Sequence, residues 1–178
     1  MLESLAPADG ERVLEIGFGH GRTIVYAAGL APTARFAGID ISPDAERVAT
    51  RRCRDLIDAG RVELRTGDAA TLPWDTESFD AAYSVHTIYF WPEPATQLAE
   101  ARRILRRGGR LVLGLRERSD EAIARFPTSM YRFYSNDEVA GLLAAAGFAE
   151  IETRDATSGA DLRIVTALAL GMRAASHE

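Results

Sequence analysis

Three glycines at alternate positions, Gly17, Gly19 and Gly21, constrain the fold of this chain more than any other feature. They follow a short apolar run, Arg12–Ile16, and precede a helical pattern over Thr23–Leu30. Glycine adopts backbone angles closed to other residues and lets the chain approach a ligand without a Cβ atom in the way. Amide groups of the first helical turn then point toward that ligand. The segment predicts a strand-turn-helix unit that cradles a small molecule, the alternative being a tight turn with no ligand.

The rest of the chain alternates short apolar runs with helical patterns, which is typical of βα units and a mainly parallel sheet. Further strands are expected at Arg35–Ile41, Arg61–Thr66, Phe79–Val85 and Arg110–Leu115. Helices are expected from Ser42 to Gly60, over Pro94–Arg107, over Asp120–Phe126, and from Ser135, which forms a capping box with Glu138, to Gly147. Two final runs, Phe148–Ala156 and Leu162–Leu170, are joined by TSGAD and predict an antiparallel hairpin.

Composition excludes several classes of function. All 21 basic residues are Arg, so neither a Schiff-base lysine nor a P-loop lysine is present. A single cysteine, Cys53, excludes an internal disulfide and a thiolate metal cluster, and the three histidines are too far apart to suggest a metal site. The net charge of −5 argues against a nucleic-acid partner.

The chain has no apolar run long enough for a membrane span, and its acidic start is unlike a signal peptide. We therefore expect a cytoplasmic protein. The use of Arg without Lys, with abundant Ala, is typical of a GC-rich bacterial genome.

The spacing of the glycine turn bears on the ligand. A dinucleotide fingerprint, G-x-G-x-x-G, would place glycine or another small residue at position 22, where this chain has Arg22. Glu15 directly precedes the turn, and a carboxylate there would repel a pyrophosphate but attract an ammonium or a sulfonium. These two residues favour S-adenosylmethionine (SAM) over a dinucleotide.

Two aspartates follow strands at positions where an open α/β sheet binds ligands. Asp40 ends the second strand and is placed to accept the ribose hydroxyls of an adenosine. Asp68, after Gly67 at the end of the third strand, is placed to read the adenine amino group. Taken singly, Asp40 is also a helix-start acid and Asp68 part of an ordinary Gly-Asp turn. Because the carboxyl ends of parallel strands share one edge, we expect both to meet the glycine turn there.

The chain resembles the class I SAM-dependent methyltransferases, in particular the small-molecule group that includes quinone-biosynthesis (type 11) enzymes. The stretches that carry the resemblance cover roughly residues 10–116, and they are VLEIGFGHG, GIDIS, GDAATLPW, SFDAAYSVH and RILRRGGRLVLG. The resemblance implies a three-layer α/β/α Rossmann-like, doubly wound sheet in the order 3-2-1-4-5-7-6 with the last strand antiparallel. It also implies a single methyltransferase domain over residues 1–178 that binds SAM.

The same resemblance implies roles for individual residues. The methionine end of SAM would lie along the glycine turn, the ribose on Asp40, and the adenine against Ile41, with its edge bound by Asp68 and Ala69. The strand end at Ser84 and Val85 would border the sulfonium. The full set of expected cofactor residues is Glu15, Gly17, Phe18, Gly19, Gly21, Asp40, Ile41, Asp68, Ala69, Ser84 and Val85.

The acceptor site is less marked in the sequence. His86 follows the fourth strand and is either a catalytic base or a pocket-shaping histidine. Tyr89, Trp91 and Tyr131 are candidate substrate contacts, with core packing as the alternative. The long connection 116–134 is a candidate substrate lid, whereas the N-terminal helical cap of the family is short or missing here.

The sequence thus predicts methyl transfer from SAM to a small-molecule acceptor, with a homodimer as one expected assembly. A SAM-fold protein without catalysis, acting as a binding or assembly module, is the first alternative. An NAD-linked reductase is the second, and Glu15, Arg22 and the terminal hairpin oppose it.

Overall fold

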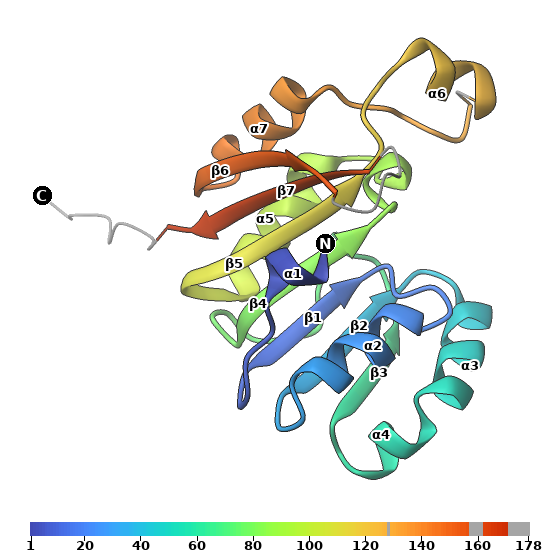
Figure 1. Ribbon diagram of the computed structural model, residues 1–178, viewed down its shortest axis with the longest axis vertical. Coiled ribbons are helices and arrows are strands. Elements are labelled where there is room, and N and C mark those ends of the chain that lie inside the picture. Colours follow the sequence, from blue (N-terminus) through green and yellow to red (C-terminus); the bar gives the residue numbers. More distant parts are fainter. Residues whose placement is uncertain (128, 157–161, 171–178) are drawn as a thin grey trace, which may run out of the picture.

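A computed structural model describes residues 1–127, 129–156 and 162–170 of the 178-residue chain. Seven strands form one sheet in the order β3-β2-β1-β4-β5-β7-β6 (Figure 1). The strands are β1 (Arg12–Ile16), β2 (Arg35–Asp40), β3 (Val62–Thr66), β4 (Phe79–Val85), β5 (Leu105–Leu115), β6 (Phe148–Asp155) and β7 (Arg163–Ala169). β1 to β5 pair in parallel, and β7 runs antiparallel to both β5 and β6. The predicted fold and strand order are confirmed.

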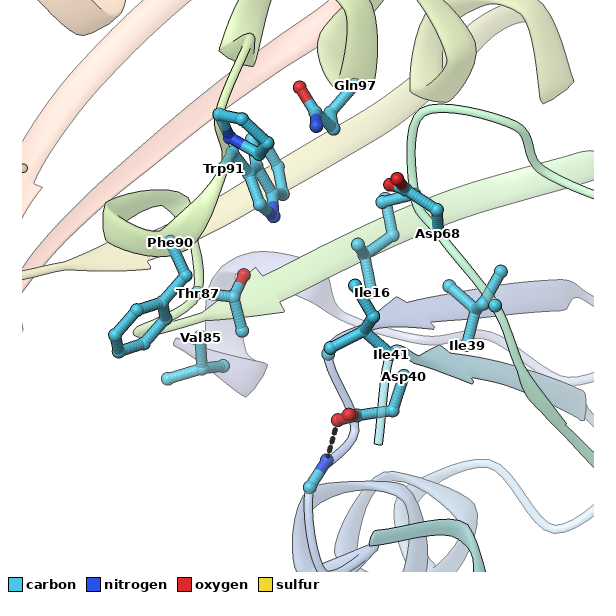
Figure 2. Close-up of a pocket in the computed structure, with 15 residues that line it drawn as sticks. Ile16, Ile39, Asp40, Ile41, Asp68, Val85, Thr87, Phe90, Trp91 and Gln97 are labelled. Atoms are coloured by element: carbon cyan, nitrogen blue, oxygen red, sulfur yellow. Dashed lines mark hydrogen bonds between the residues drawn. The ribbon is translucent and has the colours of Figure 1, made fainter. Parts of the chain in front are cut away.

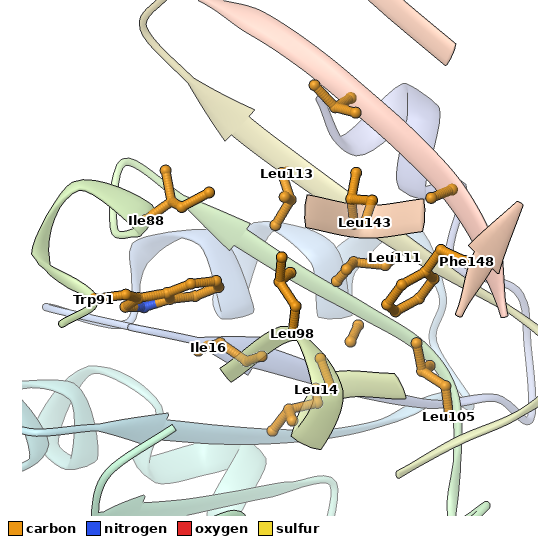
Figure 3. Close-up of a cluster of buried hydrophobic side chains, with 14 of the residues drawn as sticks. Leu14, Ile16, Ile88, Trp91, Leu98, Leu105, Leu111, Leu113, Leu143 and Phe148 are labelled. Atoms are coloured by element: carbon orange, nitrogen blue, oxygen red, sulfur yellow. The ribbon is translucent and has the colours of Figure 1, made fainter. Parts of the chain in front are cut away.

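Helices cover both faces of the sheet, as a doubly wound fold requires. One apolar cluster lies between the sheet and α5 and α7 (Figure 3), and the other lies between the sheet and α1, α2 and α3. The helices are α1 (Leu2–Leu5), α2 (Arg22–Leu30), α3 (Pro43–Arg52), α4 (Arg54–Asp58), α5 (Pro94–Ile104), α6 (Asp120–Arg125) and α7 (Asn136–Ala145).

The side chains of β1 alternate between the two faces of the sheet, and each therefore packs against the helices on its own face. Leu14 and Ile16 pack in the cluster beneath α5, whereas Val13 faces the cluster beneath α2. Glu15 shares the face of Val13 and is therefore directed into the α2 layer. Since β1 lies between β2 and β4, the helices of neighbouring units diverge to opposite faces here, and a crevice opens at the carboxyl end of β1.

Local sequence signals explain several boundaries. The Ser42 hydroxyl accepts a hydrogen bond from the amide of Ala45 at 3.2 Å, and Ser135 and Glu138 form the predicted capping box of α7. The single helix expected between Ser42 and Gly60 is interrupted at Cys53, where α3 ends and the short α4 begins.

The helix expected over Pro94–Arg107 is wrong at its C-terminal end. It stops at Ile104, because Leu105 pairs with Phe79 of β4 and so begins β5. The register with β4 then shifts, and the residues before Arg110 form an irregularity that contains Gly108 at φ 76°. β5 is consequently longer than the predicted strand Arg110–Leu115.

Three further details differ from the sequence expectations. Helix α1 and a single 3-10 turn, η1 (Ile88–Phe90), were not predicted. β2 ends at Asp40, one residue early. The TSGAD turn of the hairpin lies outside the described residues, although the two strands that it joins pair as predicted. None of the helices in the described ranges has the length and apolar character needed to cross a membrane.

Candidate cofactor cleft and aromatic pocket

A cleft of about 500 Å³ opens at the carboxyl edge of the sheet, where the strand order reverses (Figure 2). It lies beside the ends of β1, β2, β3 and β4, which are the positions at which open α/β sheets bind ligands. We call it the cofactor cleft. Its lining residues are Ile16, Gly17, Gly19, Ile39, Asp40, Ile41, Gly67, Asp68, Ala69, Val85, Thr87, Phe90, Trp91, Pro92 and Gln97.

Two of the three turn glycines border this cleft, and both need to be glycine. Gly17 and Gly19 have φ angles of 78° and 49°, in the left-handed region. A Cβ atom on Gly17 would lie 2.2 Å from Cγ2 of Thr87, in the loop after β4. At Gly19 the added atom would meet nothing within 4 Å, so this backbone faces open space. The turn therefore approaches the β4 loop closely and leaves its own backbone accessible.

Asp40 ties the glycine turn to the end of β2. Its carboxylate accepts a hydrogen bond from the amide of Gly19 at 2.8 Å (Figure 2) and a second from the amide of Ser42 at 3.0 Å. A carboxylate offers about four acceptor positions, so two remain after these bonds. Asp40 is thus held in a fixed orientation in the cleft, with acceptor capacity for a pair of hydroxyl groups.

The β3 side of the cleft combines polar and apolar groups. Asp68 accepts a hydrogen bond from the amide of Ala70 at 2.8 Å, which orients its carboxylate at the end of β3. Ile41, 75% exposed, presents an apolar side chain on the same rim. Asp40, Ile41, Asp68 and Ala69 therefore line one cleft, as the sequence predicted.

Glu15 does not border the cleft. Its side chain is 2% exposed, and the hydroxyl of Tyr83 donates a hydrogen bond to Oε2 at 2.9 Å in the α2 layer. Burial raises the pKa of Glu15 to about 8, while hydrogen bonds from Tyr83 and Thr23 oppose this rise. The carboxyl is therefore mostly protonated at neutral pH. The structure thus places Glu15 behind the glycine turn, outside the cleft lining, and its expected contact with a cationic ligand stays a prediction.

Three other expected cofactor residues also lie outside the cleft lining. Phe18 is buried in the cluster beneath α2, and Ser84 is buried with its hydroxyl bonded to that of Thr87. A Cβ atom on Gly21 would lie 3.0 Å from Cβ of Ala49 on α3. Gly21 is therefore needed for the close approach of two helices, whereas Val85 lines the cleft as predicted.

A second, smaller hollow of about 260 Å³ adjoins the first. We call it the aromatic pocket, and its lining residues are His86, Tyr89, Phe90, Arg116, Phe126, Tyr131 and Phe133. The rings of Tyr131 and Phe133 stack at 10° with centroids 5.9 Å apart, and Tyr89 lies 5.2 Å from Phe133. The pocket thus brings together three of the predicted acceptor-site residues, His86, Tyr89 and Tyr131.

His86 stands at the polar end of the aromatic pocket in an unusual backbone conformation. Its φ is 56°, a left-handed angle that a residue other than glycine adopts at an energetic cost and often at a functional site. Nδ1 lies 3.1 Å from the hydroxyl of Tyr89. Burial, and then the positive charge of Arg116, lowers the pKa of His86 below its ordinary value of 6.5. The imidazole is therefore neutral at pH 7 and able to accept a proton.

Trp91, the remaining predicted acceptor contact, lines the cofactor cleft and not the aromatic pocket. Next to it stands Gln97, which is 1% exposed and whose Oε1 has no hydrogen-bond partner in the described part of the chain (Figure 2). Gln97 was missed, although a polar residue on the apolar face of the predicted 94–107 helix was a signal. Phe90 belongs to the aromatic stretch that the sequence offered as a pocket wall, and the other lining residues that were missed are Ile16, Ile39, Gly67, Thr87, Pro92, Arg116, Phe126 and Phe133.

The predicted lid segment, 116–134, forms one wall of the aromatic pocket. It supplies Arg116, Phe126, Tyr131 and Phe133, and α6 within it stands out beyond the sheet (Figure 1). The amide of Arg132 donates to the carbonyl of Tyr89 at 3.1 Å, which attaches the segment to η1. Within residues 1–127, 129–156 and 162–170, no group of three or more His, Cys, Asp or Glu side chains is arranged to hold a metal ion.

Comparison with known proteins identifies the family. The family described as methyltransferase domain matches residues 14–113, which span β1 to β5 and most of the cofactor cleft. The chain belongs to this family. An O-methyltransferase, cnsE, from Penicillium expansum is 33% identical over 159 residues, covering 85% of this chain and 56% of that protein. The ubiquinone/menaquinone biosynthesis C-methyltransferase UbiE of Paracoccus denitrificans is 36% identical over 117 residues, covering 64% of this chain and 45% of its own.

The chain thus spans about half the length of these two relatives. Among solved structures, the [4+2]-cyclase SpnF aligns with a TM-score of 0.82 over 94% of this chain and 77% of its own, at 22% identity. At that identity the likeness concerns the fold alone.

Proposed function

We propose that this chain is a methyltransferase domain, extending over residues 1–178, that transfers the methyl group of SAM to a small-molecule acceptor. The observation that carries the proposal is the meeting of Asp40 and Asp68 with Gly17 and Gly19 in one cleft at the carboxyl edge of the sheet. Membership of the methyltransferase domain family supports it, as do relatives that are named O- and C-methyltransferases.

The residues of the cofactor cleft fit the parts of SAM. Asp40 has acceptor capacity for the two ribose hydroxyls, and Ile41 offers an apolar surface to the adenine. Asp68 and the amide of Ala69 are placed to bind the polar edge of the base, and Gly17 and Gly19 leave room for the methionine end. Bound SAM supplies an activated methyl group, so the protein's own task is to orient the acceptor and exclude water.

Glu15 and Gly21 have supporting roles in this proposal. Glu15 braces β1 against Tyr83 of β4, and Gly21 lets α2 approach α3. Both therefore hold the glycine turn in position from behind. Phe18 packs beneath the turn and Ser84 fixes Thr87, so their contribution to cofactor binding would also act through the cleft wall.

His86 is proposed as the base that takes the proton from the acceptor. Val85 and Thr87 line the cofactor cleft, and His86 between them lines the aromatic pocket. The proton acceptor thus stands directly beside the place where the two hollows adjoin. Segment 116–134 is proposed to act as the lid that closes the acceptor site, because it supplies most of the pocket's aromatic wall.

Thermal denaturation with SAM and its product S-adenosylhomocysteine tests the cofactor assignment. A ligand at 100 times its Kd stabilises the native state by about 2.7 kcal/mol. We expect that stabilisation for the wild-type protein and for the control Asp58→Asn, which changes an exposed carboxylate of α4 that does not line the cleft. Asp40→Asn and Asp68→Asn should lose most of it. A folded wild-type protein whose Tm does not respond to either compound would contradict the proposal, and a response to NAD instead would favour the reductase.

The alternative to this proposal is a SAM-fold protein without catalysis that acts as a binding or assembly module. Labelled methyl transfer separates the two. Incorporation into any small acceptor that disappears in Asp40→Asn supports the enzyme. Tight SAM binding with no transfer across a broad acceptor panel supports the binding module.

Cytoplasmic location, bacterial origin and homodimer assembly belong to this proposal as well. The relatives include a fungal protein, so origin rests on the Arg-rich, Lys-free composition. Light scattering of the purified protein at several concentrations tests the homodimer, which predicts about twice the 19.4 kDa chain mass.

A further inference from the structure

The aromatic pocket and the cofactor cleft are separate hollows with one shared wall. Val85, His86 and Thr87 are consecutive, yet the first and third line the cleft while His86 lines the pocket. His86, directly after the last residue of β4, has a left-handed backbone with φ 56°. Phe90, 49% exposed, lines both hollows. His86 and Phe90 therefore stand between a molecule in the pocket and the cleft.

The walls of the pocket favour a flat apolar molecule. Five of the seven lining residues are Phe or Tyr, and their rings contact one another at centroid distances of 4.8 to 6.1 Å. Aromatic faces and edges bind planar rings by offset stacking and edge contacts. An apolar cavity of about 150 Å³ holds benzene, so a hollow of about 260 Å³ holds about one or two fused rings.

The polar groups of the pocket are concentrated around His86. The hydroxyl oxygen of Tyr89 accepts a hydrogen bond from the amide of Arg116 and lies 3.1 Å from Nδ1 of His86. Tyr89 is only 5% exposed, so backbone and packing hold this oxygen in place. When Nδ1 carries the proton, its N–H donates a hydrogen bond to the hydroxyl oxygen of Tyr89, and Nε2 has a free lone pair. A hydroxyl group on the bound ring then has one matching proton acceptor.

We propose that the aromatic pocket binds a planar phenol of one or two rings, and that Tyr89 holds His86 in the tautomer whose Nε2 takes the phenolic proton. The inference rests on the function proposed above and names its substrate class. The phenolic O–H bond breaks and its proton passes to Nε2. The phenolate oxygen forms a bond to the methyl carbon, and the electron pair of the breaking carbon–sulfur bond stays on sulfur. The products are an aryl methyl ether and the thioether.

A panel of acceptors of similar size tests the substrate class. 2-Naphthol and phenol are compared with cyclohexanol, hexanoate and hexylamine at saturating SAM. We expect kcat/KM for 2-naphthol to exceed that for each aliphatic compound by at least tenfold. Efficient transfer to the aliphatic acid, alcohol or amine without transfer to either phenol would overturn the inference and leave the proposed methyltransferase function intact. Failure to bind SAM at all would be a failure of that function, and it is detected separately by the Tm measurement.

Variants of the pocket wall test the site directly. Tyr131→Leu removes a stacking ring and should raise the Kd of 2-naphthol, measured with S-adenosylhomocysteine present, by roughly fivefold or more. Its stabilisation by S-adenosylhomocysteine should be unchanged, which also shows that the variant is folded. Tyr26→Leu, at an exposed tyrosine of α2, is the matched control and should change neither value. An unchanged Kd in Tyr131→Leu would place the acceptor elsewhere.

The role of Tyr89 has a spectroscopic readout. Nitrogen chemical shifts of neutral His86 should show the proton on Nδ1 in the wild-type protein and a shift toward the Nε2-protonated form in Tyr89→Phe. The same variant should lower kcat for 2-naphthol several-fold with little change in KM. A wild-type His86 protonated at Nε2, or a Tyr89→Phe variant with unchanged kcat, would overturn the assignment of Tyr89 as a positioning residue.

Discussion

Replacing Glu15 by Gln should change how the stability of this protein depends on pH. In the folded chain the pKa of Glu15 is raised by burial to about 8, from an ordinary value of 4.5. Between these two values the unfolded chain loses the proton and the folded chain keeps it. The stabilising contribution is therefore complete below pH 4.5 and is lost as pH rises through about 8. Each pH unit in that window costs about 1.4 kcal/mol for one proton.

The magnitude follows from these values. Between pH 5.5 and pH 7.5, Glu15 alone should lower the free energy of unfolding by about 2.5 kcal/mol. Glutamine cannot lose a proton, and it keeps an oxygen to accept the hydrogen bond from Tyr83. Subtracting the wild-type pH profile from that of Glu15→Gln should therefore give a line that rises by about this amount.

Urea denaturation of both proteins at pH 5.5, 6.5 and 7.5 measures the difference. Glu121→Gln, the same chemical change at an exposed position of α6, serves as the control and should follow the wild-type profile. Parallel profiles for wild type and Glu15→Gln would refute the reasoning, because they would mean that Glu15 is ionised in the folded protein across this range.

Three further outcomes follow from the structure. Gly17→Ala should unfold at a distinctly lower temperature than Gly19→Ala, since only the first adds a collision at 2.2 Å to the left-handed backbone cost of roughly 1–2 kcal/mol; equal melting temperatures would contradict this. The acid limb of kcat/KM should have its midpoint below pH 6.5, because the lowered pKa keeps His86 neutral there, and a midpoint above 6.5 would exclude His86 as the base. Ser135→Ala should lower the free energy of unfolding, measured by chemical denaturation, by about 1 kcal/mol because the helix cap is lost. An unchanged free energy of unfolding would mean that the capping box does not stabilise the protein.

The strands, and the edge of the sheet at which the site lies, were predictable because they depend on short sequence patterns. Apolar runs and turn residues defined the sheet, and the acids at strand ends, Asp40 and Asp68, had to meet at one edge because parallel strands share their direction. The helix end at Ile104 was missed because Arg106 and Arg107 are good helix formers, and pairing of Leu105 with β4 overrides that preference.

The side-chain directions were harder to predict. β1 is buried on both faces, so its sequence carries no alternation to say that Glu15 faces α2 and Ile16 faces the cleft. His86, which lies where the cleft and the pocket adjoin, has a left-handed backbone that no propensity rule predicts for histidine. The residues after β4 were therefore predicted to form one acceptor site, whereas the structure divides them between two hollows, with Trp91 in the cofactor cleft.

The single side chain common to the two sets of lining residues, Phe90, gives the molecule a modular design. Four of the seven residues that line the aromatic pocket come from the connection between β5 and α7, whose described residues are absent from the lining of the cofactor cleft. Under the proposed function, exchange of that connection would change which compounds are accepted and leave the cofactor cleft intact. Under that proposal, this connection is the segment in which substitutions would change the accepted compound, in evolution or in the laboratory.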